Sequence, residues 1–434
     1  MKALALVALC LPLLAGVNDS FLLRNVTVYP VSGPKIEGAS LLVLDGKIAE
    51  IGPKVTAPKD RKGLKTIEGK GLSVYPGMID SGTEAGLSEI GSVRETNDIG
   101  ELGRFNPQLR PLVAVNPESE HIPVIRANGI TSVALLPSAV GGSPTASASL
   151  IGGQISLIHL NGWTWEEMEI RRMAAVHLRY PTIVTRTRGF GQGAGGRTAY
   201  PEAKRVRDTQ VQELKEFFEE ARRYQLARQQ KVKGQAVDLK LEAMIPLLEG
   251  KVPLVVVAER EREIKDAIDL ADQEKVRLVL ANVKRPGSTL ETIARKKIPV
   301  ILGTTLDLPE EEDDPYDAPF TFPGELVKAG VKVAFASFEN QFSRNLPYEA
   351  AQAVAFGMPY DEGLKSVTLN PAEIWGVADQ VGSIEKGKLA DLMVTDGDPL
   401  EIRTQIKMLF IKGEAVDLES KHTRLYKKYS ARPD

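Results

Sequence analysis

Short apolar runs separated by turn-forming residues open the chain. Between Phe21 and about Ser73 the sequence reads LLRNVTVYP, ASLLVLDGKIAEIGP and LKTIEGKGLSVYP, and an Asp45-Gly46 pair typical of a β-hairpin interrupts the second segment. A matching pattern returns only near the C-terminus, in GSIEKGKLADLMVTDG and IKMLFIKGEAVDL. We therefore expect the two ends of the chain to form one small β unit.

Between these ends, short apolar strands alternate with amphipathic helices. The strands are β-branched and almost continuously apolar, which is typical of strands buried on both faces: LSVYPGMID, GITSVALLP, PTIVTR, VPLVVVA, VRLVLAN, IPVILGT and VKVAFAS. The helices are expected at 202–229, 239–248, 263–274, 347–356 and 371–375. This pattern predicts parallel strands joined by crossover helices.

The predicted fold is of the α/β class, a TIM-like (β/α)8 barrel with a small β-sandwich formed by the N- and C-terminal segments. Seven of the eight barrel strands are identified above, the segment 138–159 has no clear pattern, and an open doubly wound sheet is the alternative. We assign the β-sandwich to residues 18–73 together with 380–420, and the barrel to residues 74–379.

The first residues have the pattern of an export signal. Lys2 precedes an apolar stretch from Ala3 to Ala15 that is too short to span a bilayer, and small residues allow cleavage near Ala15 to Val17. We expect residues 1–17 to be a signal peptide, the mature protein to be periplasmic or extracellular, and no membrane anchor to remain. Cys10, the one cysteine of the chain, lies in this segment, so the mature protein would have no disulfide and no thiolate chemistry.

Charge and common motifs exclude several functions. The chain has 55 basic and 57 acidic residues, a net charge of −2, and therefore no broad basic surface for nucleic acid. The glycine-rich run 191–196 matches a dinucleotide-binding spacing but does not open directly into a helix, so we interpret it as a loop. Arg186, Arg188 and Arg197 beside it are candidates for binding an anion, or are simply solvated.

Two motifs resemble the amidohydrolase superfamily. PGMIDSGTEAGL is similar to the first-strand motif of that superfamily, in which PG-x-ID precedes His-x-His, and residues 368–400, TLNPAEIWGVADQVGSIEKGKLADLMVTDGDPL, resemble its closing segment. The resemblance is to metal-dependent hydrolases of the imidazolonepropionase type. It implies a barrel fold and hydrolysis of a carbon–nitrogen bond at a metal centre.

The residues at the expected metal-ligand positions depart from the pattern of this family. Gly82 and Glu84 replace the two histidines of His-x-His, Val257 stands where a histidine ends the fifth strand, and Asn282 where a histidine ends the sixth. Phe338 occupies the position of the catalytic aspartate after the eighth strand. Glycine, valine and phenylalanine have no side-chain ligand atom, so no metal is expected at the usual site.

The remaining candidate residues form a short set. Glu84 and Glu339 are weak catalytic candidates, although Glu339 would face away from the site unless the backbone turns there. Asp80 shares a strand face with Glu84, and Asp80, Glu84, Asn282 and Arg188 are the candidate ligand-binding residues. The four histidines, which are far apart in sequence, are His121, His159, His177 and His422. An acidic loop could hold a cation or merely be solvated: Glu310, Glu311, Glu312, Asp313, Asp314 and Asp317.

Three functions stay open. The first is a degenerate amidohydrolase that binds a small ligand, or that forms a homodimer or a heteromer with an active amidohydrolase, without a cofactor. The second is an active hydrolase of non-peptide C–N bonds, of the cyclic amide or amidine type, with a divalent metal such as zinc at a non-canonical site. The third is a structural or interaction protein. Glu84, Asn282 and Glu339 would build the site of the second.

Overall fold

The computed structural model describes residues 20–59, 61, 64–137, 149–185 and 196–432. The predicted signal peptide, most of the glycine-rich loop, and Arg186 and Arg188 lie outside these residues. Within them, no helix is both long and apolar enough to cross a membrane.

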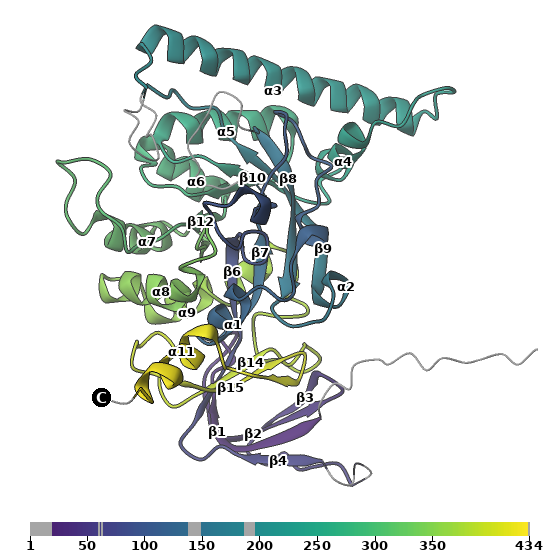
Figure 1. Cartoon of the computed structure of the whole chain (residues 1–434). Helices are drawn as coiled ribbons and strands as arrows, with labels where there is room; N and C mark the ends of the chain where they lie inside the picture. The colour runs from purple at the N-terminus through teal and green to yellow at the C-terminus, as the bar shows by residue number, and fades with distance from the viewer. Residues whose placement is uncertain (1–19, 60, 62–63, 138–148, 186–195, 433–434) are drawn as a thin grey trace, which may run out of the picture.

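The two ends of the chain meet in one eight-stranded sheet, as predicted (Figure 1). In this sheet the strand order is β16-β15-β14-β5-β1-β2-β3, and β4 pairs with β1. The predicted hairpin is confirmed, because Asp45 and Gly46 both have positive φ between antiparallel β2 and β3. The strands are β1 Phe21–Val28, β2 Ile36–Leu44, β3 Lys47–Gly52, β4 Lys65–Glu68, β5 Ser73–Pro76, β14 Leu392–Thr395, β15 Ile406–Ile411 and β16 Glu414–Val416.

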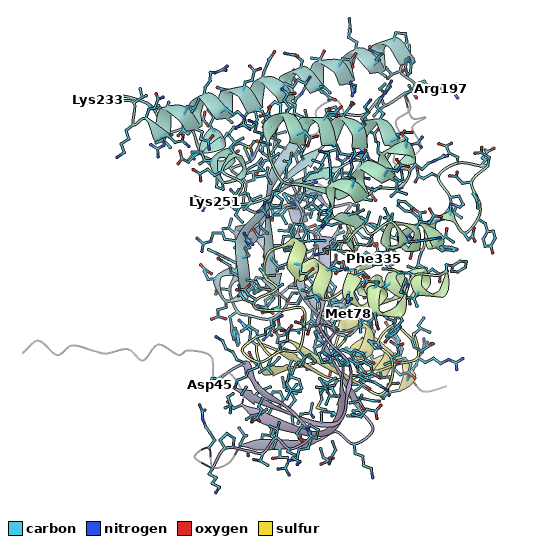
Figure 2. The ribbon with its side chains drawn as sticks, turned by 180° about the vertical axis from the view of Figure 1, so that it is seen from behind. Asp45, Met78, Arg197, Lys233, Lys251 and Phe335 are labelled. Carbon is cyan, nitrogen blue, oxygen red and sulfur yellow. The ribbon has the colours of Figure 1, made fainter. Side chains whose placement is uncertain are left out.

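The central part of the chain forms a nearly closed barrel of eight strands, in the order β6 to β13. The strands are β6 Met78–Thr83, β7 Ile130–Leu135, β8 Ile151–His159, β9 Glu169–Arg179, β10 Leu254–Val257, β11 Leu278–Ala281, β12 Val300–Leu302 and β13 Val333–Phe335. Figure 2 shows Met78 of β6 and Phe335 of β13 near one another in the middle of the molecule, where the two ends of this sheet approach. The TIM-like barrel is therefore confirmed.

One strand runs against the predicted direction. β8 is antiparallel to both β7 and β9, whereas the other neighbouring pairs are parallel. The stretch 160–168 between β8 and β9 is too short for the crossover that two parallel neighbours require. The predicted strand PTIVTR is wrong, since residues 181–185 form no strand and β9 ends at Arg179. Pro181 has no backbone N–H to donate to a ladder.

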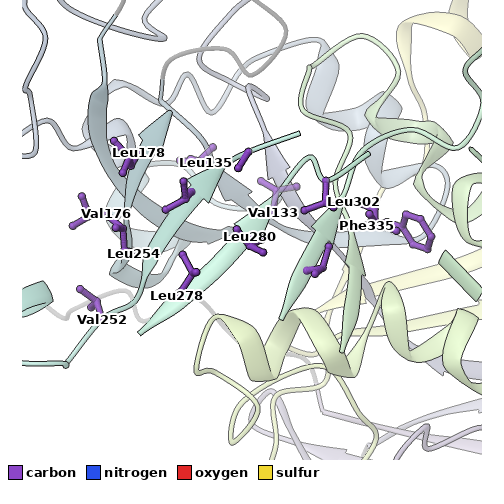
Figure 3. Close-up of a cluster of buried hydrophobic side chains, with 14 of the residues drawn as sticks. Val133, Leu135, Val176, Leu178, Val252, Leu254, Leu278, Leu280, Leu302 and Phe335 are labelled. Carbon is purple, nitrogen blue, oxygen red and sulfur yellow. The ribbon is translucent and has the colours of Figure 1, made fainter. Parts of the chain in front are cut away.

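Helices cover the outer face of the barrel. They are α1 His121–Arg126, α2 Trp165–Met168, α3 Tyr200–Gln229, α4 Leu239–Leu248, α5 Glu261–Glu274, α6 Leu290–Lys296, α7 Ala318–Lys328, α8 Leu346–Ala355, α9 Tyr360–Ser366, α10 Leu369–Ile374 and α11 Lys421–Ser430. All five predicted helices are present within two residues at each end. Figure 3 shows the buried side chains that the strands send to this outer side, among them Val133, Val176, Leu254, Leu280 and Phe335.

Side chains of the opposite strand face fill the barrel. Ile79, Ala134, Val255 and Ile301 belong to this inner cluster, with Trp375, which follows α10. Because side chains alternate along a strand, His177 faces inward with Ala175, and no hydrogen-bond partner lies within reach of its ring among the described residues. Burial, and after it the charge of Arg179, lowers the pKa of His177 to about 3, so the ring is neutral.

A buried histidine–aspartate pair joins the barrel to the outer sheet. Nε2 of His159, at the end of β8, lies 2.9 Å from Oδ2 of Asp391, which precedes β14. Oδ1 of Asp391 accepts a hydrogen bond from the backbone amide of Lys412 at 2.7 Å. The backbone carbonyl of Asp391 accepts one from the amide of Gly77, which lies between β5 and β6. Asp391 thereby connects the barrel sheet to the outer sheet.

The His159→Ala variant should lower the free energy of unfolding by about 3 kcal/mol, because the buried Asp391 carboxylate loses a donor. Urea denaturation measures this loss. The control is Glu37→Gln, which breaks an exposed ion pair with Lys35 and should cost less than about 0.5 kcal/mol. Equal stability of the two variants would contradict a joining role for His159.

Candidate functional site

The carboxyl ends of the parallel strands carry most of the polar side chains of the barrel mouth. Glu84 follows β6, Arg179 ends β9, Glu259 follows β10, Asn282 follows β11 and Glu339 follows β13. In barrels of this architecture the loops at this end build the functional site. The functional site is therefore expected at this end of the barrel.

Asp80 closes the barrel between β6 and β13. Its Oδ1 accepts from the amides of Gly82 at 3.0 Å and Ser337 at 3.1 Å, and its Oδ2 accepts from Oγ of Ser337 at 2.6 Å. Asp80 is fully buried, and burial raises its pKa to about 7 although these hydrogen bonds lower it. A register shift after Asp80 also breaks the alternation of β6, so the predicted shared face with Glu84 does not hold.

Phe338 lies at the barrel mouth, on the side where β12, β13 and β6 meet. Its backbone is left-handed, with φ of 54°, and its amide donates to the carbonyl of Gly82 at 2.8 Å. A Cβ placed on Gly82 would lie 3.2 Å from Cε1 of this ring, and one on Gly303 would lie 3.3 Å from its Cδ2. The ring therefore sits between two glycines, and it packs against the inner cluster that includes Val257.

The turn at Phe338 brings Glu339 toward Glu84. Burial, and after it the charge of Glu339, raises the pKa of Glu84 to about 7. Oε1 of Glu84 is buried without a hydrogen-bond partner among the described residues. Glu339 accepts from the Phe342 amide at 3.0 Å, and burial raises its pKa as well. The backbone turn on which a role for Glu339 depended is therefore present.

A second polar group lies across the mouth, at β9 to β11. The amide nitrogen of Asn282 donates to Oε1 of Glu259 at 2.8 Å. Burial lowers the pKa of Arg179, and the nearby Glu259 carboxylate opposes this shift. Arg179 was not predicted as a site residue, because the strand in this region was expected at residues 181–186 and β9 ends at Arg179. Glu259 was not predicted either, although the charged pair Glu259-Arg260 directly after the apolar run PLVVVA could have indicated it.

A cavity of about 1010 Å³ opens beside these residues. Its wall is built from the carboxyl ends of β11, β12 and β13, the loop 303–317, the first half of α7 and the start of α8. Asn282, Phe338 and Glu339 lie in the wall. The volume is that of a site for a small molecule.

Comparisons with known proteins now decide the family. The model of the amidohydrolase family matches residues 261–416, and the solved structure of an amidohydrolase from Thermotoga maritima is similar with a TM-score of 0.76 and 25% identity. That similarity covers 92% of this chain and 99% of the other. The chain belongs to the amidohydrolase superfamily.

Other members of the superfamily match in part. Amidohydrolase tasK of Hapsidospora irregularis is 24% identical over 97% of this chain. The chain spans 46% of the length of tasK, less than half of that protein. An imidazolonepropionase of Porphyromonas gingivalis is 39% identical over 74 residues, 16% of this chain and 18% of its own. The structure of molinate hydrolase, at 15% identity and a TM-score of 0.55, covers 96% of this chain and 98% of its own, and shares the fold.

The residues of this chain do not fit the metal centre that the resemblance implies. Gly82, Val257 and Phe338 offer no side-chain ligand atom, and the amide of Asn282 is bonded to Glu259. Across the described parts of the chain, no three His, Cys, Asp or Glu side chains gather in a way that could hold a metal ion. The ring of Phe338 also occupies the space next to Gly82. No step through a metal is derived.

The other candidates are scattered. His159 pairs with Asp391, His177 lies inside the barrel, His422 is exposed on α11, and Nε2 of His121 lies 3.1 Å from the carbonyl of Glu89. In the acidic loop, Glu310 pairs with Lys284 and Arg260, Glu311 with Arg260, and Asp314 with Arg285. Basic side chains already neutralise much of this loop.

The contact between Phe338 and Gly82 can be measured by a double-mutant cycle. Gly82→Ala should cost about 1 kcal/mol of unfolding free energy, since its methyl group would also lie 3.1 Å from Leu136 Cδ1. In a Phe338→Ala background the cost should fall by at least half. Gly91→Ala, in open space, is the control. Additive effects of the two substitutions would contradict the contact.

The raised pKa of Glu84 predicts a pH-dependent stability. The folded protein keeps this proton where the unfolded chain has released it, so stability falls as pH rises from about 4 through about 7. The free energy of unfolding of Glu84→Gln should exceed that of the wild type by about 3 kcal/mol at about pH 8 and equal it at about pH 4. Urea denaturation at both pH values measures this, and a difference independent of pH would refute the assignment.

Proposed function

We propose that this member of the amidohydrolase superfamily binds a small organic ligand at the barrel mouth without the metal centre of the family. The observation that carries the proposal is the ring of Phe338 between Gly82 and Gly303, at the position where the resemblance places the catalytic aspartate. An aromatic ring there adds apolar surface, and it supplies no ligand atom and no proton acceptor. The cavity beside the ring supplies the space for a ligand.

The remaining polar groups support binding by the protein alone. Arg179 and Glu259 place opposite charges at the ends of β9 and β10, so this side of the mouth is balanced without an added cation. Glu84 and Glu339 keep carboxyl groups on the other side. We propose in addition that the protein is exported. It would act as a homodimer or as a heteromer with an active amidohydrolase.

Thermal unfolding with and without a strong chelator tests the proposal. The midpoint should stay within about 1 °C on chelation and on addition of zinc or manganese, because no metal contributes to the folded state. A tightly bound structural or catalytic metal contributes several kcal/mol, so its removal would lower the midpoint by several degrees. If chelation lowered the midpoint of the wild type but not that of Glu84→Ala, the result would favour a metal site built on Glu84.

A second candidate is hydrolysis of a non-peptide C–N bond, and the carboxyl pair at Glu84 favours it. A buried carboxyl group with a pKa of about 7 and an unbonded oxygen is suited to general acid–base catalysis. Glu339 beside it could orient the attacking water.

A screen of cyclic amides and amidines tests this second function. If it holds, Glu84→Gln should reduce kcat by at least about 100-fold, and Glu312→Gln, an exposed position in the acidic loop, should leave kcat unchanged. The absence of turnover with every compound, or turnover equal in the wild type and Glu84→Gln, would eliminate Glu84 as a catalyst.

A further inference from the structure

The wall of the barrel-mouth cavity is strongly acidic. Seven acidic side chains line it, against two basic ones: Asp307, Glu310, Asp314, Asp317, Glu325, Glu339 and Glu349, with Lys284 and Arg285. Both bases are already paired, Lys284 with Glu310 and Arg285 with Asp314 at 3.2 Å. The cavity therefore has an excess of negative charge, although the chain as a whole is nearly neutral.

Glu349 places one of these charges in the inner wall. It is 6% exposed, and its carboxylate accepts only from uncharged groups, among them the amide of Thr305 at 2.6 Å and the hydroxyl of Thr304 at 2.9 Å. These hydrogen bonds fix the start of the loop 303–317. They do not cancel its charge, and no Lys or Arg pairs with Glu349 among the described residues.

Glu339 stands near Glu349 between aromatic side chains. Burial raises the pKa of Glu339, the Phe342 amide and the charge of Arg344 lower it, and the charge of Glu349, the smallest of these effects, raises it. Phe338 precedes Glu339, Phe342 donates its amide to the Glu339 carboxylate at 3.0 Å, and both phenylalanines line the cavity. The guanidinium of Arg344 already lies over one face of the Phe342 ring, 5.6 Å from its centroid, so a ligand cation would use the ring of Phe338 or the other face of Phe342. Carboxylates beside aromatic faces are the surroundings that bind organic cations, through charge and through cation–π attraction.

The outer rim of the cavity is apolar. Leu306 and Leu308 line it and are 50% and 81% exposed, and Phe322 of α7 lies in the same wall. Exposed leucines next to a cavity are suited to cover the apolar body of a ligand. A ligand with a charged end and an apolar body would match both regions.

We propose that this cavity binds an organic cation, an ammonium, amidinium or guanidinium group on an aromatic or aliphatic body. The charged group lies at Glu339 and Glu349 beside Phe338 and Phe342, and the apolar body extends toward Leu306 and Leu308. This inference rests on the proposed metal-free binding function and names the class of its ligand. The bound cation adds positive charge to a wall in which acidic side chains outnumber basic ones.

Three probes of one shape and different charge test the inference. Benzamidine is a cation, benzamide is neutral and benzoate is an anion, and each is titrated calorimetrically into the full protein, once with and once without excess chelator. Benzamidine should bind at least about tenfold more tightly than benzamide, and benzoate most weakly. Equal binding of the three, or no binding of benzamidine at millimolar concentration, would overturn the cation site.

Variants locate the site. Glu339→Gln should weaken the binding of benzamidine at least about fivefold and leave the binding of benzamide unchanged. Asp317→Asn, a second change in the wall, should weaken benzamidine binding less. Glu312→Gln removes the same charge from an exposed position that does not line the cavity and should change nothing. Thermal unfolding verifies that each variant is folded. Benzamidine binding unaffected by Glu339→Gln would overturn the placement.

The experiment separates the two proposals. Benzamidine binding that persists with chelator but lacks charge preference overturns the cation site and leaves metal-free binding standing. Charge-selective binding that chelator abolishes overturns metal-free binding.

Discussion

The packing of one aromatic ring across the closure of the barrel is the constraint on which the site depends. β6 and β13 do not form a ladder, and the barrel is held together there by the Asp80–Ser337 hydrogen bonds and by the Phe338 amide on Gly82. These bonds fix the left-handed turn at Phe338. This backbone turn places the Phe338 ring between Gly82 and Gly303. It also leaves Glu339 in the cavity wall and close to Glu84.

Gly82 and Phe338 are thus coupled positions. In the superfamily pattern a metal-binding histidine would stand at 82 and an aspartate at 338, and here the small residue makes room for the large one. Any side chain at 82 would meet the ring at a distance tighter than ordinary van der Waals contact. Under the proposed function, the two replacements belong to one rearrangement of the mouth, which exchanges ligand atoms for apolar surface.

Much of the fold could be predicted, because strand and helix periodicity is a local property. The Asp45-Gly46 hairpin, helices such as α5 and the joining of β5 with β14 in one sheet all followed from such patterns. β8 and β9 did not, since the direction of β8 depends on a short connection and the polar start of β9, EIRRM, conceals a buried strand. LSVYPGMID was predicted as one strand, but Gly77 divides it between the two sheets.

The candidate site was predictable only in part. Motif spacing located Gly82, Glu84, Asn282 and Phe338 at the strand ends, where the structure places them. The approach of Glu339 to Glu84 depends on a backbone turn that strand alternation does not predict. Arg179 was missed because its strand was misplaced, and Glu349 because it reaches the cavity from α8, far from any strand end in the sequence.

The most direct test of a mouth filled by Phe338 without a metal is the metal content of the purified, tag-free mature protein, determined by elemental analysis. The account predicts far less than one equivalent of zinc, manganese or iron per chain. One equivalent of any of these metals, lost in the Glu84→Ala variant, would contradict it and would place a metal centre on Glu84.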